Sequence, residues 1–266
     1  MPTTHRPFAL ITGASSGIGE ALTHCFASAG HDLVLVARSA DKLKTLATQL
    51  EAEQSIKVLA LPMDLAAPGA AQQLAAMLKR RKRVPDVVVN CAGVLEQQHF
   101  VRMTPAGHQA IIDLNISALT AMLSHLLPLM VARGSGRVLN VASVAAFQPI
   151  PLLATYAASK AYVLSLTEAL SEELEGTGVT ITALCPGITA TNMLNTATEA
   201  NGRLSKLPGF LIGNVDDVAR EGFDACMRGD VICVPGAINR VATLASRSTP
   251  KWLLRRVSGA FARRAG

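Results

Sequence analysis

The chain has 266 residues, of which 50% are hydrophobic and 4% aromatic, and its formal net charge is +6. That length suits one large α/β domain, and the few aromatic residues disfavour a protein that stacks on nucleic-acid bases. Seven basic residues and no acidic residue follow Asp230. The rest of the chain is therefore nearly neutral, and its charge predicts no nucleic-acid partner.

The cysteines and the N-terminal residues indicate the cellular compartment. The five cysteines are scattered without a CxxC pair, at Cys25, Cys91, Cys185, Cys226 and Cys233. Reduced thiols are expected, with neither a metal site nor a disulfide framework. The opening MPTTHRPFAL lacks the apolar core of a secretory signal, and the most apolar long segment, 116–132, is interrupted by His125 and Pro128. We expect a cytoplasmic protein, with peripheral membrane association through the C-terminal tail as the alternative.

Short apolar runs alternate with helical patterns along the chain. The runs that predict strands are 8–13, 32–38, 57–64, 86–93, 136–143, 179–187 and 230–236. The patterns that predict helices are 17–29, 40–53, 68–83, 105–132, 155–175 and 215–228. This alternation predicts a single Rossmann-like, doubly wound α/β domain over 1–238, with a seven-stranded, mostly parallel sheet flanked by helices. The irregular segment 188–214 is interpreted either as a mobile lid or as a poorly ordered loop.

A glycine-rich turn, ITGASSGIGEAL, joins the first predicted strand to the first predicted helix. Gly13 permits the tight turn, Gly17 lets the backbone approach a pyrophosphate, and Gly19 permits close contact between helix and strand. A plain tight turn is the alternative, but the position after the first strand of a βαβ unit favours a dinucleotide site. The loop residues expected at the cofactor are Gly13, Ser15, Ser16, Gly17, Ile18 and Gly19.

The end of the second strand indicates which dinucleotide binds. A site for NAD usually has an acidic residue there, which binds the ribose 2′-hydroxyl. This strand ends in Ala37 and Arg38, and Asp32 lies at its opposite end. Because an arginine can pair with a 2′-phosphate, we expect NADP(H), with a solvated surface arginine as the alternative. Asp64, at the end of the third strand, is expected either at the adenine amino group or as a cap of its own turn.

Together these motifs resemble those of the short-chain dehydrogenase/reductase family, over about residues 6–236. They are TGASSGIG (12–19), Asp64, NCAG (90–93), Asn115, Ser143, YAASK (156–160) and PGITAT (186–191), in the order and spacing of that family. Cys91 departs from the family, which commonly has a second asparagine at a position that mainly steadies the sheet. The resemblance implies an enzyme that transfers a hydride between NADP(H) and a carbonyl or alcohol group.

The resemblance also assigns a catalytic tetrad, Asn115, Ser143, Tyr156 and Lys160. Tyr156 would be the acid in reduction and the base in oxidation. Lys160, one helical turn on, would lower the pKa of Tyr156 and hydrogen-bond the nicotinamide ribose. Ser143 would polarise the substrate carbonyl, and Asn115 would hold a water in a proton path to solvent. Taken singly, each has a structural alternative, such as a packed tyrosine, a turn cap or a polar group that bends a helix.

Further cofactor contacts are implied by the same resemblance. They are Asn90, Ala92, Gly93, Tyr156, Lys160, Pro186, Gly187, Ile188 and Thr191. Ala92 and Gly93 would lie beneath the adenosine ribose, where a larger side chain would clash. The backbone near Ile188 would meet the nicotinamide carboxamide, and Thr191 would cap that end of the cofactor.

The residues after Ser143 predict the substrate class. The segment VAAFQPIPLLAT, together with Met193 and Leu194, indicates an apolar pocket and hence a small apolar ketone, aldehyde or alcohol. The alternative is a catalytically idle, NADP(H)-binding regulatory member of the same fold. A homodimer or homotetramer is the family-level expectation, since the helices 105–132 and 155–175 resemble those that form dimer bundles in relatives.

The C-terminal tail, 239–266, is basic and amphipathic. It combines Trp252, Leu253, Leu254, Val257 and Phe261 with arginines. Such a segment touches an anionic membrane, covers the substrate entrance, or packs on the body as a helix with its arginines in water. The run KRRKR at 79–83 ends a predicted helix, where basic residues suit the helix dipole, and is expected to be solvated.

Overall fold

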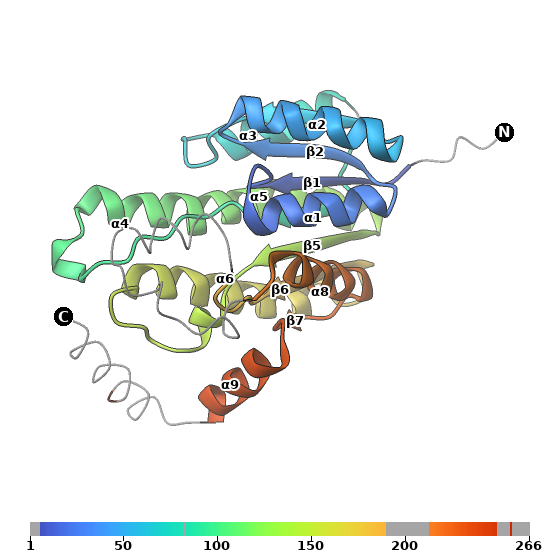
Figure 1. The fold of residues 1–266 in the computed structure, drawn as a ribbon. Coiled ribbons are helices and arrows are strands. Elements are labelled where there is room, and N and C mark those ends of the chain that lie inside the picture. Colours follow the sequence, from blue (N-terminus) through green and yellow to red (C-terminus); the bar gives the residue numbers. More distant parts are fainter. Residues whose placement is uncertain (1–5, 82, 190–212, 249–255, 257–266) are drawn as a thin grey trace.

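The computed structural model describes residues 6–81, 83–189, 213–248 and Arg256 (Figure 1). Its strands are β1 (Phe8–Thr12), β2 (Asp32–Ala37), β3 (Val58–Pro62), β4 (Val87–Asn90), β5 (Gly136–Val141), β6 (Val179–Leu184) and β7 (Ile232–Cys233). Its α-helices are α1 (Gly17–Ser28), α2 (Ala40–Gln54), α3 (Ala70–Arg80), α4 (Pro105–Ile112), α5 (Leu119–Arg133), α6 (Ala154–Glu173), α8 (Val215–Arg228) and α9 (Ala237–Ser248). Shorter helical turns are η1 (Phe100–Arg102), the π-helix η2 (Asp113–Ala118) and η3 (Val144–Phe147).

The seven strands form one sheet in the order β3-β2-β1-β4-β5-β6-β7, and neighbouring strands pair in parallel. Leu10 of β1, for example, lies beside Val34 of β2 and Val88 of β4. The predicted doubly wound α/β fold is therefore confirmed. The chain reverses its direction across the sheet between β1 and β4, and open α/β sheets bind ligands outside the carboxyl ends of the strands at such a point.

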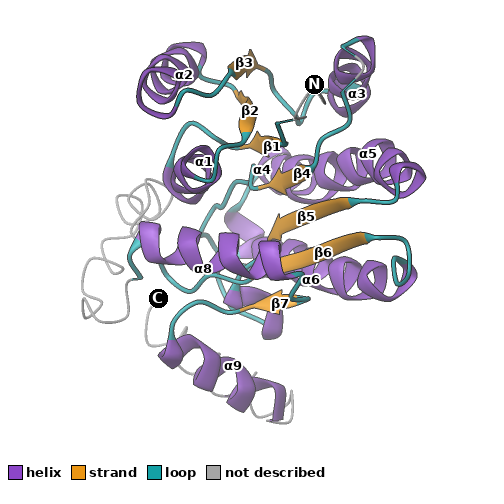
Figure 2. Cartoon of the chain, turned by 90° about the vertical axis from the view of Figure 1, so that its right-hand side faces the viewer, coloured by secondary structure: helices purple, strands orange, loops and turns teal. Residues whose placement is uncertain are grey.

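Helices cover both faces of the sheet (Figure 2). On one face α3, α5 and α6 pack against strand residues that include Leu10 and Val138. On the other face α1, α2 and α8 pack against residues that include Ile11 and Leu35. Successive strand residues point to opposite faces, so a strand covered on both sides is apolar along its whole length. This is why the strands are visible in the sequence as continuous apolar runs.

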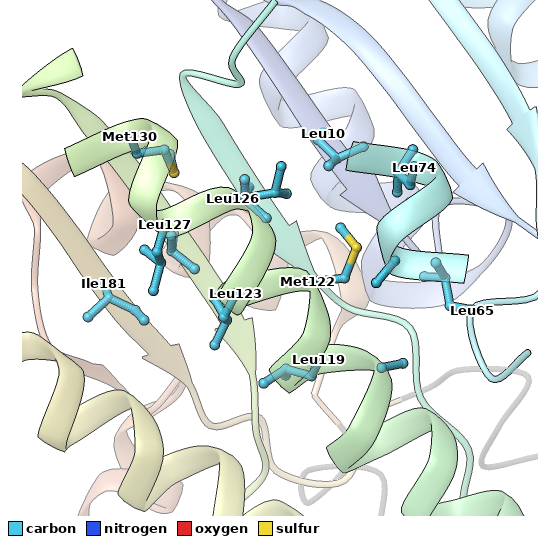
Figure 3. Close-up of a cluster of buried hydrophobic side chains, with 14 of the residues drawn as sticks. Leu10, Leu65, Leu74, Leu119, Met122, Leu123, Leu126, Leu127, Met130 and Ile181 are labelled. Carbon is cyan, nitrogen blue, oxygen red and sulfur yellow. The ribbon is translucent and has the colours of Figure 1, made fainter. Parts of the chain in front are cut away.

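Helix α5 supplies much of the core on its face of the sheet (Figure 3). Its buried residues are Leu119, Met122, Leu123, Leu126, Leu127 and Met130, which recur every three or four positions. Within the described residues, the helical stretch 105–133 is long and apolar enough to cross a membrane by length and composition. The buried stripe packs against the sheet, and 39% of the most apolar window of this stretch is buried.

Most helix bounds differ from the predicted ones by one or two residues, and two helices depart in ways that the backbone explains. The predicted helix 105–132 is α4, η2 and α5 in succession, with a wider π-turn at 113–118. A π-turn carries an extra residue, which the overall apolar composition of the stretch does not reveal. The helix predicted over 68–83 begins only at Ala70, because Gly69 before it takes a left-handed φ of 76°.

The C-terminal part of the prediction is described only in part. The predicted boundary between a catalytic domain, 1–238, and a tail, 239–266, falls inside α9 and remains a prediction. Residues 190–212 of the predicted lid or loop lie outside the described residues, and so do the tail's Trp252, Leu253, Leu254, Val257 and Phe261. The short turns η1 and η3 were not predicted, since three or four residues carry too little periodicity.

Leu126 tests the packing of α5, because only 1% of its surface is exposed. We expect Leu126→Ala to lower the free energy of unfolding by about 2–5 kcal/mol, since it removes buried methyl groups and leaves a cavity. Urea unfolding followed by circular dichroism measures the loss. Val131→Ala on the same helix is the matched control, because Val131 is 37% exposed and should lose much less. Equal losses at the two positions would contradict the described packing.

Candidate active site

A cleft of about 730 Å³ opens beside the carboxyl ends of the strands. Its walls contain most of the predicted site residues: Gly13, Ser15, Ser16, Gly17, Ile18, Gly19, Arg38, Asp64, Ala92, Gly93, Ser143, Tyr156, Lys160, Pro186, Gly187 and Ile188. Asn90 and Asn115 are buried and do not line it, and Thr191 lies outside the described residues. A second hollow of about 540 Å³, against β3 and α3, contains none of the predicted residues.

The glycine loop turns sharply into α1. Gly13 and Gly17 take φ values of 68° and 57°, both in the left-handed region that favours glycine. A side chain at position 19 would place its Cβ 2.2 Å from the carbonyl oxygen of Gly13, so the helix start approaches the turn too closely for another residue. The N-cap, Ser16, makes no side-chain capping bond to the first turn. An uncapped helix N-terminus in a cleft wall fits a pyrophosphate group.

Thr12 fixes this loop to the end of β4. Its Oγ1 donates to the carbonyl oxygen of Val89 (3.1 Å) and accepts from the N–H groups of Cys91 (3.0 Å) and Ala92 (3.1 Å). The contact is so close that a Cβ on Gly13 would lie 2.9 Å from the Ala92 backbone. The sequence analysis included Thr12 in the TGASSGIG motif but gave it no role, because its partners come from a distant strand.

The acidic Asp32 and the basic Arg38 lie at opposite ends of β2, as predicted. Arg38 and Ser39 line the cleft. Asp32 lies at the opposite end, where it forms ion pairs with Arg6 (3.8 Å) and Arg83 (3.6 Å). The end of β2 in the cleft thus carries a basic side chain, which fits a phosphate better than a hydroxyl.

Asp64 takes the capping role, one of the two roles that the sequence left open. Its Oδ1 accepts a hydrogen bond from the N–H of Ala66 (3.0 Å), so the carboxylate caps its own turn. The same residue lines the cleft next to Leu65. A carboxylate that is held by its own turn keeps a second oxygen for a donor on a bound molecule.

Asn90 has a structural place that differs from the prediction. Its Nδ2 donates to Oδ1 of Asn140 on β5 (2.9 Å), and Asn140 donates in turn to Oγ1 of Thr167 on α6 (2.9 Å). The three side chains are buried in the layer between sheet and helix. Alternation along β4 points Asn90 into this layer, so it joins β4, β5 and α6 and does not face the cleft.

Lys160 is buried beside Tyr156 on α6. Its ammonium donates to the carbonyl oxygen of Val141 (2.8 Å) and lies 5.8 Å from the centroid of the Tyr156 ring. Burial lowers the pKa of Lys160 to about 8, and the thiols of Cys91 and Cys185 oppose this effect. A buried ammonium is costly, so a lysine held in the wall of a cleft is a candidate functional group.

The pKa of the Tyr156 phenol is shifted in the direction opposite to the prediction. The sequence predicts that Lys160 lowers the pKa of Tyr156, but in the structure burial is the dominant influence and raises it. A hydrogen bond with the Ser143 side chain acts in the opposite direction. The free-energy cost of removing a phenolate from water exceeds the stabilisation that the neighbouring groups provide. The phenol therefore keeps its proton at neutral pH.

Asn115 is buried behind the cleft, where hydrogen bonds hold its side chain. Its amide nitrogen donates to the carbonyl oxygen of Val94 and to Oγ of Ser159, both at 3.0 Å, and its Oδ1 accepts from the N–H of Val94 (2.9 Å). Ser159 donates to the carbonyl oxygen of Tyr156 (2.7 Å). A water at the predicted position would have to compete with Val94 and Ser159 for hydrogen bonds with the Asn115 side chain. The side chain therefore serves to tie η2 to the end of β4 and to α6.

Comparison with known proteins identifies the family. A profile described as short chain dehydrogenase matches residues 7–202. The chain belongs to the short chain dehydrogenase family. A short chain dehydrogenase of Pseudocercospora fijiensis (strain CIRAD86) is 36% identical over 187 residues, which are 67% of this chain and 58% of that protein.

Solved structures that share the fold include two dehydrogenases. A short-chain dehydrogenase from Sphingobium yanoikuyae in complex with NADPH is 34% identical, with a TM-score of 0.81, and the match covers 90% of this chain and 92% of that one. The bulky-bulky ketone specific alcohol dehydrogenase from Comamonas testosteroni is 27% identical, with a TM-score of 0.78 and coverage of 92% and 93%. As a short chain dehydrogenase, this protein is an oxidoreductase of a family that uses NAD(P)(H) and acts on small substrates.

Cys91 is a cleft residue of this short chain dehydrogenase that the sequence placed only in the sheet. It lines the cleft, and its thiol is close enough to interact electrostatically with Lys160 and Tyr156. Burial raises the pKa of the Cys91 thiol to about 11, so it is a neutral thiol near pH 7. Cys91 therefore adds no charge to the site.

The wall of the cleft around Ser143 is largely apolar. Its side chains include Val94, Leu95, Leu114, Val144, Ala145, Ile150, Pro151 and Leu153, with two amides, Gln97 and Gln148. The N–H of Gln98 donates to the carbonyl oxygen of Leu152 (2.9 Å), which joins the segment after β4 to the segment after η3. Leu152 takes a left-handed φ of 70°, an uncommon conformation for a branched residue. This hydrogen bond thus connects the two segments whose residues line this side of the cleft.

The lowered pKa of Lys160 predicts a pH dependence of stability. An unfolded lysine has a pKa of about 10.4, so between about pH 8 and pH 10 the unfolded chain binds more protons at this residue than the folded chain. The contribution of residue 160 to stability should therefore rise with pH across this window.

We expect the free energy of unfolding of the wild type, minus that of Lys160→Met, to increase from about pH 8 to pH 10. Urea unfolding of both proteins at a series of pH values measures this difference. Lys42→Met is the control for the loss of an exposed lysine. A difference that stays constant across the window would show that Lys160 is not a destabilised, buried ammonium.

Proposed function

We propose that this short chain dehydrogenase interconverts an apolar ketone or aldehyde and the corresponding alcohol, with NADP(H) as cofactor and Tyr156 as general acid and base. The proposal rests on one observation, the meeting of Tyr156, Lys160 and Ser143 in the wall of the same cleft that contains the glycine loop. A proton donor, a buried cation and a hydroxyl are the groups that a carbonyl oxygen needs when it gains negative charge.

The cofactor would be held by the turn after β1, the end of β2 and helix α6. The N-terminus of α1 would bind the pyrophosphate, Arg38 the 2′-phosphate, and Lys160 the nicotinamide ribose. When bound, NADP(H) supplies or accepts the hydride. The neighbour from Sphingobium yanoikuyae, which was solved with NADPH, supports this choice of dinucleotide. Asp64, Ala92, Gly93 and the segment 186–188 would contact the remainder of the cofactor.

Tyr156 would carry the proton that the carbonyl oxygen receives. Because burial raises its pKa, the phenol is protonated at neutral pH and suited to donate to an oxygen that gains negative charge. The phenolate left behind would be stabilised by the ammonium of Lys160 and by the Ser143 hydroxyl. In alcohol oxidation the same groups would take the proton from the substrate hydroxyl.

The apolar wall around Ser143 would select the substrate. A cleft of about 730 Å³ has room for a nicotinamide and a substrate with hydrocarbon character. The structural neighbour from Comamonas testosteroni is specific for bulky-bulky ketones, which supports a ketone with a bulky substituent on each side of the carbonyl group. Gln97 and Gln148 are polar groups in this wall that would orient a second oxygen on the substrate.

Assembly into a homodimer or homotetramer remains a prediction. Short chain dehydrogenases commonly form oligomers. Helices α5 and α6 expose Val131 and Tyr162, which would be covered if these helices met those of a second copy.

Replacement of Tyr156 tests the reaction. We expect Tyr156→Phe to lower kcat for NADPH-dependent reduction of apolar ketones by about 100-fold or more, because the ring stays but the proton donor is lost. NADPH consumption followed at 340 nm measures kcat, and fluorescence titration shows whether NADPH still binds.

The chain offers a matched control, since Tyr162 is its only other tyrosine. The hydroxyl of Tyr162 is hydrogen-bonded to Thr120 (2.9 Å) away from the cleft, so Tyr162→Phe should keep the wild-type rate. Full activity in Tyr156→Phe would exclude the proposed proton transfer. A wild type that binds NADPH tightly yet reduces none of a broad ketone panel would instead favour an idle, cofactor-binding protein.

Replacement of Arg38 tests the cofactor preference. We expect Arg38→Asp to weaken NADPH binding by about tenfold or more while NADH binding changes little, because only NADPH carries the 2′-phosphate. Fluorescence titration with each dinucleotide gives the two dissociation constants. Lys42→Asp makes the same change of charge on nearby α2, outside the cleft wall, and controls for long-range electrostatics. An equal effect of Arg38→Asp on both dinucleotides would refute the 2′-phosphate contact.

A further inference from the structure

Helix α9 begins where the chain leaves β7, at the edge of the sheet (Figures 1 and 2). Its first turn is fixed to α8 through one carboxylate. Glu221 on α8 pairs with the guanidinium of Arg240 and accepts a hydrogen bond from the N–H of Gly236 (3.2 Å). Arg240 also donates from Nε to the carbonyl oxygen of Val234 (2.9 Å). Held in this way, α9 packs beside η3 in the wall of the cleft.

Asn239, in this first turn, lies against the backbone of Gly187 in the same wall. A Cβ at position 187 would lie 2.5 Å from Nδ2, 2.6 Å from Oδ1 and 2.8 Å from Cγ of Asn239. These are the three atoms that it would meet first, and all belong to one side chain. The amide is itself held, because Nδ2 donates to the carbonyl oxygen of Pro235 (2.9 Å). A side chain at position 187 could enter only by displacing this amide.

The backbone conformation does not explain the glycine at position 187. Gly187 is not among the described glycines with a left-handed φ, so its backbone does not require a residue without Cβ. The close approach of Asn239 supplies the reason instead. The absence of a side chain at Gly187 lets the amide of α9 contact the wall of the cleft directly.

The order of the strands places Gly187 at the reacting end of the cleft. Neighbouring strands follow one another as β2-β1-β4-β5-β6, with Arg38 after β2, Ser143 after β5 and Gly187 after β6. The N–H of Val144 donates to the carbonyl oxygen of Pro186 (2.9 Å), which joins the wall beside Ser143 to the segment of Gly187. A dinucleotide with its 2′-phosphate at Arg38 would therefore place its nicotinamide end, and not its adenosine, beside Gly187.

We propose that Asn239 is a positioning residue for the cofactor, which holds the Gly187 backbone where the nicotinamide end of NADP(H) would bind. The inference rests on the proposed function, because it requires that the cleft binds this dinucleotide. Asn239 is not among the described residues that line the cleft, so it would act through Gly187. It lies outside residues 7–202, which the family profile matches, and it is the first residue of the predicted tail. The chain after β7 would thus complete the cofactor site.

Two ligands separate the two ends of the cleft. NADPH would span it, whereas adenosine 2′,5′-bisphosphate carries the 2′-phosphate without the nicotinamide. We expect Gly187→Ala to weaken NADPH binding by about tenfold or more, because the new methyl group meets Asn239 and displaces the wall. Binding of adenosine 2′,5′-bisphosphate should stay unchanged, since Arg38 and the glycine loop are untouched. Isothermal titration calorimetry gives both dissociation constants.

Removal of the Asn239 side chain should make room for the methyl group. In the Asn239→Ala background, we expect the change Gly187→Ala to weaken NADPH binding by less than about threefold, because neighbouring residues are not additive. Asn239→Ala alone should weaken NADPH binding by about threefold or more, since the Gly187 segment loses its support. Adenosine 2′,5′-bisphosphate should again bind as to the wild type. Loss of overall stability would instead weaken both ligands.

Val241→Ala is the matched control on α9, because Val241 is 70% exposed and should bind both ligands like the wild type. Circular dichroism melts establish that each variant is folded. If Gly187→Ala melts before its binding can be measured, recovery of the melting temperature in the double variant shows the same clash. A double variant that is equally unstable would contradict it.

Three binding results would overturn the proposal. They are an equal effect of Gly187→Ala with and without the Asn239 side chain, unchanged NADPH binding in Asn239→Ala, and equal weakening of both ligands in Asn239→Ala. Each of them would leave the proposed function intact. Failure of the wild type to bind NADPH would refute the proposed function, and this inference with it.

Discussion

The buried ammonium of Lys160 is the constraint on which the site depends. It projects from α6 to the end of β5, where the Val141 carbonyl oxygen accepts its hydrogen bond. A charge removed from water is tolerated only where its surroundings hold it in place. Gly93 lies beside it, since a Cβ at that position would be in ordinary contact with the ammonium, 3.5 Å away. The packing of α6 on the sheet therefore sets the position of Tyr156 as well.

Two buried polar networks maintain this packing from behind the cleft. One runs from Asn90 through Asn140 to α6, and the other joins Asn115 to Ser159 and the end of β4. Buried polar groups are costly unless they are paired, so each network favours a single placement of α6 against the strands. The same burial that demands these partners raises the pKa of the Tyr156 phenol and lowers that of the Lys160 ammonium. The proton transfer that we propose and the stability of the fold thus depend on the same burial.

The sequence predicted what depends on local pattern and missed what depends on neighbours. Continuous apolar runs were enough to place the strands and hence the sheet, and the spacing of Tyr156 and Lys160 was enough to place them on one side of a helix. Asn90 was assigned to the cofactor because it belongs to the NCAG motif of the family that the sequence resembles, whereas strand alternation turns its side chain inward to Asn140. The direction of the Tyr156 pKa shift was wrong because desolvation depends on the whole surrounding structure.

In the π-turn η2, the number of residues matters as much as their side chains, because the turn accommodates one extra residue. Removing one residue from 113–118 would let α4 and α5 join as a regular helix with nearly the same relative rotation, because the wide turn had accommodated the extra residue. His108 on α4, whose Nδ1 lies 2.7 Å from Oγ1 of Thr155, would keep its place. Asn115 lies within the turn, and its amide nitrogen donates to the Val94 carbonyl oxygen and to Ser159. A one-codon deletion here would therefore displace Asn115 from these partners while α4 and α5 keep their packing.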